Sequence, residues 1–202
     1  ECKDEKFAGG WGFGTVNPDL YNSYDDDDQR KDGGILNFAN IKKLIRMLRI
    51  HRAYEDTGYF LLKYLPRQGG NSQCTGDKDL NYRNNLRVYR YAETLLNAAE
   101  LILRTGGDTA GAQNYLDQVR ARAYRTTVEN LGAHKVVANI DNVLEERHLE
   151  LYGEGKRFWD LVRSGKANEV LGSRGYKDNK KYLPIPSSEI DKSAGTLTQN
   201  PY

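Results

Sequence analysis

Apolar residues recur at steps of three and four in the second half of the chain, the spacing of one face of an α-helix. The clearest run lies between Leu86 and Arg104 and forms a single apolar stripe of Val88, Ala92, Leu95, Ala99 and Ile102. Two glycines follow at positions 106 and 107, and glycine is the residue that most often ends a helix. The pattern therefore predicts a helix over about 86–104.

A second helical pattern starts directly after these glycines. Asp108 can cap its first turn, and the apolar positions that repeat up to about residue 125 are Ala112, Tyr115, Leu116, Val119 and Ala123. A connection this short forces the two helices to pack antiparallel. The pair has the approximate length of one tetratricopeptide-like unit, which cannot bury both of its faces alone. We therefore expect neighbouring helices.

Three further helices are predicted, over about residues 40–52, 140–152 and 156–163. The helix over 140–152 is expected to end at Gly153, and the helix over 156–163 at Ser164-Gly165. Residues 182–186 contain two prolines separated by one residue, which holds the segment extended. The last residues are expected to form a docked, non-helical tail.

Glycine, aspartate, asparagine and tyrosine dominate residues 1–34, which include the acidic run Asp25 to Asp28. Residues 66–85 carry a proline and several glycines. Both segments have the composition of turns and loops. The expected fold class is thus mostly α, with tetratricopeptide-like helical pairs joined by long irregular loops.

Composition narrows the possible partners. The chain has 202 residues and a formal net charge of +2, so no overall field attracts nucleic acid or an anionic membrane. Cys2 and Cys74 are too far apart for a paired metal motif and too few for a disulfide scaffold. The first residues lack the order of a signal peptide, and we expect sequence upstream of Glu1.

Several segments of the second half carry distinctive combinations of residues. The helix pair carries Arg90-Tyr91-Ala92-Glu93 and Val119-Arg120-Ala121-Arg122-Ala123. The more specific segments are residues 146–151 (ERHLEL), residues 157–161 (RFWDL) and the tail 182–186 (YLPIP) with the terminal Gln199-Asn200-Pro201-Tyr202. Read together, these segments resemble the C-terminal half of the SusD/RagB family. The family usually has a glycine before the final tyrosine, which is absent here.

This resemblance implies a function and a location. Such proteins are surface-exposed lipoproteins of a bacterial outer membrane that bind an oligosaccharide or polysaccharide, or in some members a peptide, without enzymatic turnover. They cover a SusC-like TonB-dependent transporter. The lipid anchor would belong to an N-terminal part that this chain does not contain. Residues 1–85 would form a loop-rich, ligand-side region, and residues 86–202 the helical C-terminal region of the same domain.

Aromatic side chains in the loop-rich start are the candidate ligand contacts: Trp11, Phe13, Tyr21 and Tyr24. A flat ring covers the C–H face of a sugar while a tyrosine hydroxyl forms hydrogen bonds. The alternative is that these rings only seal the rim of the core. Trp159 and Phe158, by contrast, lie among apolar residues at helical spacing and are expected to pack in the core.

Two alternatives to a binding protein remain at this stage. One is a tetratricopeptide-like scaffold that binds only protein. The other is a glycosidase using Glu150 and Glu154, since paired carboxylates cleave glycosidic bonds. Spacing favours ion pairs instead, from Glu154 to Arg157 and from Asp160 to Arg163.

No cofactor or metal is expected. The histidines show no ligand spacing such as HExxH, and the glycines near the start lack the context of a phosphate loop. The acidic run Asp25 to Asp28 lacks the spacing of an EF-hand, so a solvated loop is favoured over a Ca²⁺ site.

Overall fold

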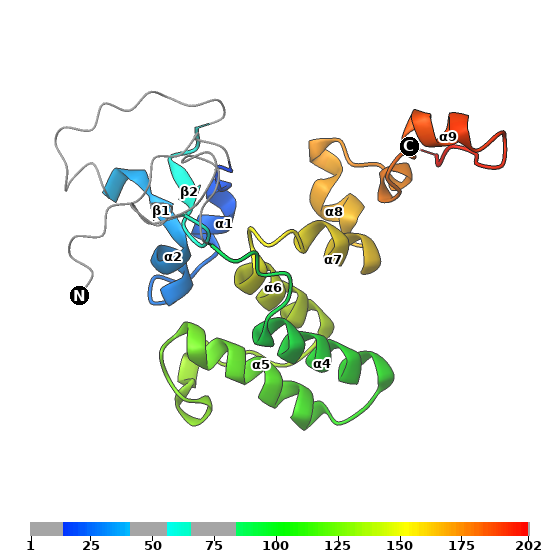
Figure 1. Ribbon diagram of the computed structural model, residues 1–202. Coiled ribbons are helices and arrows are strands. Elements are labelled where there is room, and N and C mark those ends of the chain that lie inside the picture. Colours follow the sequence, from blue (N-terminus) through cyan, green and yellow to red (C-terminus); the bar gives the residue numbers. More distant parts are fainter. Residues whose placement is uncertain (1–13, 41–55, 66–83, 202) are drawn as a thin grey trace. The chain divides into compact units, whose positions relative to one another are not determined.

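The computed structural model describes residues 14–40, 56–65 and 84–201. The chain forms two compact units, residues 1–154 and 155–202. Helices dominate both, which confirms the mostly helical fold class (Figure 1). The predicted helix over 40–52 lies almost wholly outside the described residues. The functional division at residue 85 stays a prediction.

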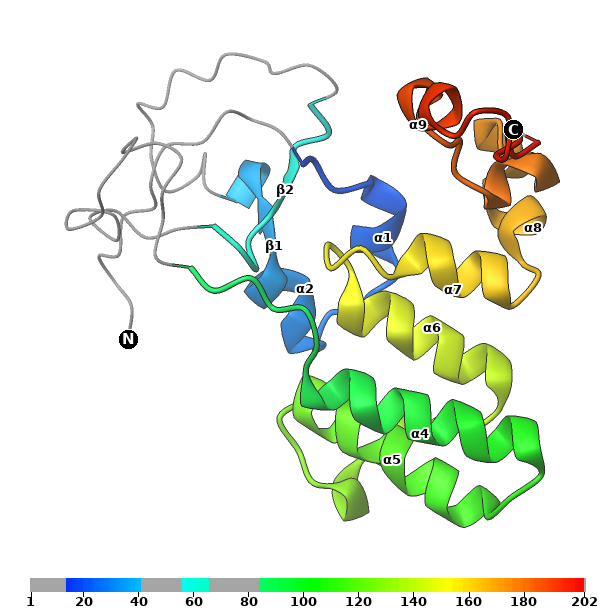
Figure 2. The same ribbon diagram turned by 45° about the vertical axis from the view of Figure 1, so that its right-hand side comes forward.

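Three helices form the body of the first unit: α4 (Tyr91–Thr105), α5 (Thr109–Ala123) and α6 (Ile140–Leu151). Figures 1 and 2 show them stacked side by side, with α4 and α5 joined by a short turn. The core among them consists of Leu95, Leu96, Ala99, Ala112, Leu116, Val119 and Val143. The antiparallel pair and its third neighbour are as the apolar periodicity predicts.

Capping residues explain where these helices begin and end. The Asp108 carboxylate accepts the backbone N–H of Ala110 at 3.0 Å and starts α5, as predicted. Gly106 adopts the left-handed conformation, with φ of 67°, and ends α4. Helix α4 begins at Tyr91 rather than at Leu86, because Arg90 is extended and the residues before it are exposed.

Short elements occupy the segment that was expected to be irregular. Helix α1 (Pro18–Asn22) starts with a proline and is capped by Asn17, and α2 (Gln29–Gly34) is capped by Asp28. Strand β1 (Ile35–Asn37) pairs antiparallel with β2 (Tyr59–Leu61) in the register Ile35 to Leu61. The prediction of little regular structure over residues 1–34 is therefore wrong for the described part, since elements this short leave no readable periodicity.

A second apolar cluster joins these short elements to the end of α6. It contains Val16, Tyr24, Ile35, Leu149 and Tyr152, with Leu20, Tyr21, Tyr59 and Leu61 packed against it. Between α5 and α6 the chain makes two 3-10 turns, η1 (Val128–Asn130) and η2 (Gly132–His134). The loop-rich start and the helical body thus share one compact unit.

The second unit consists of α7 (Arg157–Arg163), α8 (Ala167–Leu171), η3 (Gly172–Arg174), η4 (Asp178–Lys181) and α9 (Ser187–Lys192). The side-chain amide of Gln199 both donates to and accepts from the backbone of Ile185, each at 2.8 Å. The Asn200 amide donates to the Leu183 carbonyl at 2.8 Å. These bonds dock the tail onto the extended proline segment, although a short helix, α9, lies between them.

One expectation for the second unit is wrong. Trp159 is 48% exposed rather than packed in the core, and its ring meets that of Phe158 edge-on at 5.0 Å between centroids. The inward position on this short helix is taken by Leu161, which is 2% exposed. A helix of two turns has room for only one buried apolar row.

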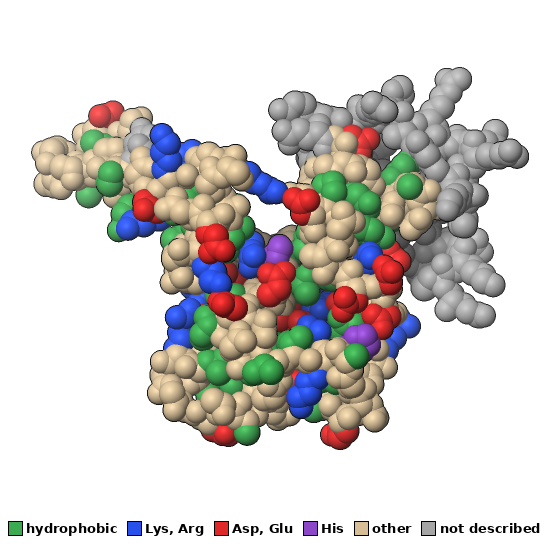
Figure 3. Space-filling view, turned by 180° about the vertical axis from the view of Figure 1, so that it is seen from behind, with side chains coloured by type: hydrophobic (Ala, Val, Ile, Leu, Met, Phe, Trp, Pro, Cys, Tyr) green, Lys and Arg blue, Asp and Glu red, His purple; other side chains and the backbone are tan. Residues whose placement is uncertain are grey.

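The surface charges are mixed, as the small net charge of +2 suggests. On the face drawn in Figure 3, acidic and basic side chains are interspersed rather than gathered by sign. Within the described ranges, every helix is too short or too polar to cross a membrane.

Candidate functional site

A pair of partly exposed tyrosines lies on the elements of the first unit's loop-rich part. Tyr21 of α1 stacks on Tyr59 of β2, with ring centroids 4.4 Å apart and 28° between the planes. The Tyr21 hydroxyl donates to Asp32 at 3.0 Å and accepts from the Asn37 amide at 3.4 Å. Ring surface beside fixed carboxylate and amide groups is the combination that sugar-binding sites use.

The other predicted contact residues have different surroundings. Tyr24 is only 3% exposed, and its hydroxyl donates to the Leu149 carbonyl at 2.6 Å. Burial raises the pKa of this hydroxyl far above its usual range. Tyr24 therefore belongs to the packing of the unit, and a ligand contact by it stays a prediction that its burial does not favour. Trp11 and Phe13 lie outside the described residues.

The support for this site is a column of three carboxylates on one face of α6 and the residues after it. Glu146, Glu150 and Glu154 are four residues apart, so like charges follow one another along the same face. Glu146 and Glu150 are each 1% exposed. Such a column is stable only when cations satisfy it, because a buried unpaired charge is very costly.

The cations come from four separate segments. Arg30 of α2 bridges Glu146 at 2.6 Å and Glu150 at 3.0 Å, and Arg120 of α5 bonds the other oxygen of Glu146 at 2.6 Å. The remaining ion pairs to Glu150 and Glu154 come from Arg90, Arg122 and Lys63.

Because Arg30 and Lys63 belong to the loop-rich part and the other arginines to the helices, the column fixes the aromatic pair's scaffold to the helical body. Asp28 completes the arrangement by holding the Arg30 guanidinium at 2.6 Å. Helix α2, which carries Arg30, also carries Asp32, the partner of Tyr21. The position of the tyrosine pair therefore depends on the ionic contacts behind it.

The pKa values follow from this arrangement. Burial alone would raise the pKa of Glu150, but Arg122 and Arg90 outweigh it and hold that pKa below its usual range. Burial also raises the pKa of Glu154, but the bonds to Arg90 and Lys63 outweigh this effect and lower it. Burial lowers the pKa of Lys63 to about 8, with Glu154 opposing the shift.

These carboxylates do not fit a glycosidase. A general acid must keep its proton near neutral pH, which requires a raised pKa and access to the glycosidic oxygen. Glu150 is buried, its pKa is lowered, and its oxygens are bonded to arginines. The expected pair from Asp160 to Arg163 is confirmed at 2.6 Å. Glu154 is bonded to Lys63 and Arg90, and its expected pair with Arg157 stays a prediction.

The acidic run after α1 has partners that its sequence does not reveal. Asp26 bonds Lys31 at 2.6 Å, and Asp28 bonds Arg30. Asp25 accepts the Tyr124 hydroxyl at 2.6 Å, and Asp27 lies 3.0 Å from the His134 imidazole. Among the described residues, Asp25, Asp27 and His134 form a group that can hold a metal ion.

The profile of the SusD family matches residues 42–202, which is most of the chain. The chain belongs to the SusD family. SusD-like protein P2 from Formosa agariphila is 26% identical over 212 residues, covering 97% of this chain and 41% of the relative. SusD-like protein P38 from the same organism is 40% identical over 95 residues, covering 44% of this chain and 18% of the relative.

Solved structures of this family have the same fold. Surface glycan-binding protein A from Bacteroides thetaiotaomicron, in complex with laminarihexaose, is 42% identical with a TM-score of 0.85, covering 98% of this chain and 43% of that one. A laminarin binding SusD-like protein is 38% identical with a TM-score of 0.83, covering 99% and 40%. This chain thus spans about two fifths of the length of these two solved chains.

Proposed function

We propose that this protein binds a glycan without cleaving it. The observation that carries the proposal is the likeness to a glycan-binding protein whose structure holds laminarihexaose, at 42% identity over 98% of this chain. A second similar structure is described as laminarin binding. Laminarin and its hexaose are therefore the first ligands to test.

The partly exposed pair Tyr21 and Tyr59 is our proposed contact surface within the described residues. Both rings stand on elements that the ionic column holds in place, so ring surface is presented without a large ordering cost. Asp32 and Asn37 would bind sugar hydroxyls beside the rings. Trp11 and Phe13 remain proposed contacts on the grounds of sequence alone.

The family supports a wider proposal for the whole protein. It would be a lipoprotein of the outer-membrane surface, anchored through a lipid on an N-terminal part, and it would deliver its glycan to a SusC-like TonB-dependent transporter. Nucleic acid is not among the proposed partners, since the net charge is only +2.

A second candidate, binding to a protein, is favoured by one specific surface. The segment before α4 and the first residue of that helix expose several large apolar side chains: Leu86 at 82%, Val88 at 70%, Tyr89 at 55% and Tyr91 at 70%. Clustered exposed apolar residues mark contacts with other proteins more often than contacts with sugars. This surface suits a tetratricopeptide-like scaffold or a peptide-binding role.

Calorimetric titration with laminarihexaose, cellohexaose and maltohexaose tests the first candidate. We expect heat with at least one hexaose, and at least a tenfold loss of affinity in Tyr21→Ala and in Tyr59→Ala. Tyr182→Ala is the matched control, because Tyr182 is an exposed tyrosine of the other unit. Mass spectrometry of the same mixtures should show the hexaose uncut after a day.

A paired change separates the second candidate from the first. Leu86→Ser with Val88→Ser removes apolar surface but leaves both tyrosines intact. Under the glycan proposal this variant keeps full affinity for the hexaose. Loss of co-purification with the transporter in the same variant would assign the apolar segment to the protein contact. Unchanged heats in both tyrosine variants would refute the proposed sugar surface.

A further inference from the structure

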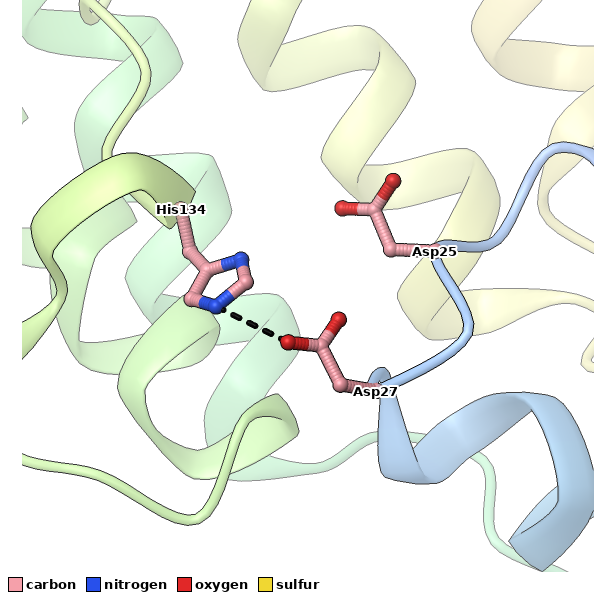
Figure 4. Close-up of side chains that lie close together, drawn as sticks. All are labelled: Asp25, Asp27 and His134. Carbon is pink, nitrogen blue, oxygen red and sulfur yellow. Dashed lines mark ion pairs between the residues drawn. The ribbon is translucent and has the colours of Figure 1, made fainter.

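Three potential metal ligands converge from segments more than a hundred residues apart. Asp25 and Asp27 precede α2, and His134 ends η2. Each offers one ligand atom, and these three atoms all lie within 4.8 Å of one another. Figure 4 shows the two carboxylates and the imidazole turned toward a common space, with the His134 Nε2 atom 3.0 Å from an Asp27 oxygen.

One neighbouring side chain holds two of these groups in place. The Tyr124 ring stacks on the His134 imidazole, with centroids 3.9 Å apart and 15° between planes. Its hydroxyl donates to Asp25 Oδ2 at 2.6 Å. The His134 carbonyl also accepts the Arg120 Nε–H at 2.6 Å. Partners of this kind, which orient metal ligands without touching the metal, are a usual part of protein metal sites.

The charges around the group favour a cation. Asp26 and Asp28, the neighbours in sequence, are paired with Lys31 and Arg30. Arg120, whose guanidinium lies 5.4 Å from the Tyr124 ring centre, is paired with Glu146 at 2.6 Å. Within the part of the chain that the structure describes, Asp25 and Asp27 instead have a hydroxyl and an imidazole as partners. The two carboxylates therefore face a phenol and an imidazole, whereas their neighbours in the acidic run are paired with lysine and arginine.

We propose that Asp25, Asp27 and His134 bind one divalent transition-metal ion, with Zn²⁺ as the best match. An imidazole nitrogen with carboxylate oxygens suits Zn²⁺, whereas Ca²⁺ takes six to eight oxygen ligands. Ligand atoms around a tetrahedral Zn²⁺ lie about 3.3 Å apart, given bonds of roughly 2.0–2.1 Å. The three ligand atoms here lie within 4.8 Å of one another, so each distance between two of them would shorten by about 1.5 Å or less. Water would complete the coordination on the exposed side.

Such an ion would fasten the acidic run to the turn between α5 and α6. The acidic run leads directly into α2, which carries Arg30 and Asp32. The metal would therefore brace the same part of the unit that presents Tyr21. It would act on the residues before α2, whereas the carboxylate column holds α2 itself through Arg30. This role is separate from glycan binding, because none of the three ligands belongs to the proposed sugar surface.

Calorimetric titration of the full chain with ZnCl₂ and, separately, CaCl₂ tests the proposal after EDTA treatment and dialysis. The background carries Cys2→Ser and Cys74→Ser, because thiolates bind Zn²⁺ strongly. We expect one Zn²⁺ per chain, and at least a tenfold loss of affinity in His134→Gln and in Asp27→Asn. Asp26→Asn is the matched control, since Asp26 belongs to the same acidic run but pairs with Lys31.

Histidine side-chain NMR gives a readout that does not depend on affinity. The chain has three histidines, so their imidazole nitrogen signals can be told apart. Zn²⁺ should move the signal of His134 and leave that of His148 unchanged. Absence of Zn²⁺ binding, or equal binding by the wild type and His134→Gln, would overturn the proposal. Ca²⁺ binding that matches Zn²⁺ and ignores the His134 change would also overturn it, because the site would then be one of carboxylates alone.

Discussion

The hydroxyl of Tyr152 occupies the space where a side chain at position 34 would begin. A methyl group built on Gly34 would lie 1.7 Å from the Tyr152 hydroxyl oxygen and 2.9 Å from the ring carbon that bears it. Tyr152 is 5% exposed, and its hydroxyl has no hydrogen-bond partner among the described residues. This close approach brings the end of α2 against the end of α6.

We expect Gly34→Ala to lower the free energy of unfolding by about 1–3 kcal/mol, because the overlap must be relieved by movement of a packed ring. Tyr152→Phe should raise it by roughly 1 kcal/mol, since a buried hydroxyl without a partner is unfavourable. Urea unfolding of both variants and of the double variant measures the coupling. The double variant should recover more of the loss in Gly34→Ala than the separate gain in Tyr152→Phe supplies, and strict additivity would contradict the steric account.

The carboxylate column predicts a large effect from a small change. Glu150→Gln removes one negative charge from among Arg30, Arg90 and Arg122 while keeping the side-chain size. We expect a loss of about 3–5 kcal/mol in the free energy of unfolding, as for breaking other buried ion pairs. Glu145→Gln, on the same helix but half exposed, should cost less than about 1 kcal/mol. Similar losses in the two variants would contradict the assigned role of the column.

Acid should unfold the first unit through the same carboxylates. Against the effect of burial, arginines hold the pKa of Glu150, and Arg90 with Lys63 holds the pKa of Glu154, below the value of about 4.3 for an unfolded chain. As the pH falls below about 4.3, the unfolded state takes up protons first. The stabilisation that these carboxylates give above that pH is therefore lost as the pH falls to their lower pKa values in the folded state. Unfolding free energies measured from pH 7 to pH 2 should fall with a shallower slope in Glu150→Gln than in the wild type.

The amide side chain of Gln199 predicts a local effect at the tail. Gln199→Glu keeps the oxygen that accepts the Ile185 N–H but loses the N–H that donates to the Ile185 carbonyl. Hydrogen exchange at the Ile185 amide should speed up at least tenfold, because the paired bonds no longer form together. Lys192→Gln, a change on α9, should leave that exchange rate within twofold.

The helical body could be predicted from the sequence because its determinants are local. The apolar stripe from Leu95 to Val119 and the cap at Asp108 depend on residues within a few positions of one another. The ion pairs of the carboxylate column could not be predicted, because Glu150 bonds Arg30 and Arg90, which lie 120 and 60 residues away in sequence. Spacing suggests the nearby Arg157 as a partner of Glu154, but it contains no information on the distant Lys63 and Arg90 that also bond Glu154.

Candidate site residues were predictable only in part. Composition pointed to the tyrosines, but it could not separate Tyr24, which is buried, from Tyr21, which stacks on Tyr59. Tyr59 itself was missed, because a three-residue strand leaves no signal around it. His134 was likewise missed as a partner of Asp27, since its relevance depends on the fold bringing η2 beside the acidic run.

The way in which Arg30 reaches Glu146 and Glu150 bears on how this protein could diversify. Arg30 lies two positions after Asp28, the residue that caps α2, and its guanidinium bonds Glu146 and Glu150 of the helical body, whereas the Tyr21 hydroxyl bonds Asp32 and Asn37 instead. Exchanges of ring-bearing residues around Tyr21 would therefore leave the attachment intact. The proposed sugar surface could thus change in evolution while the frame that carries it is retained.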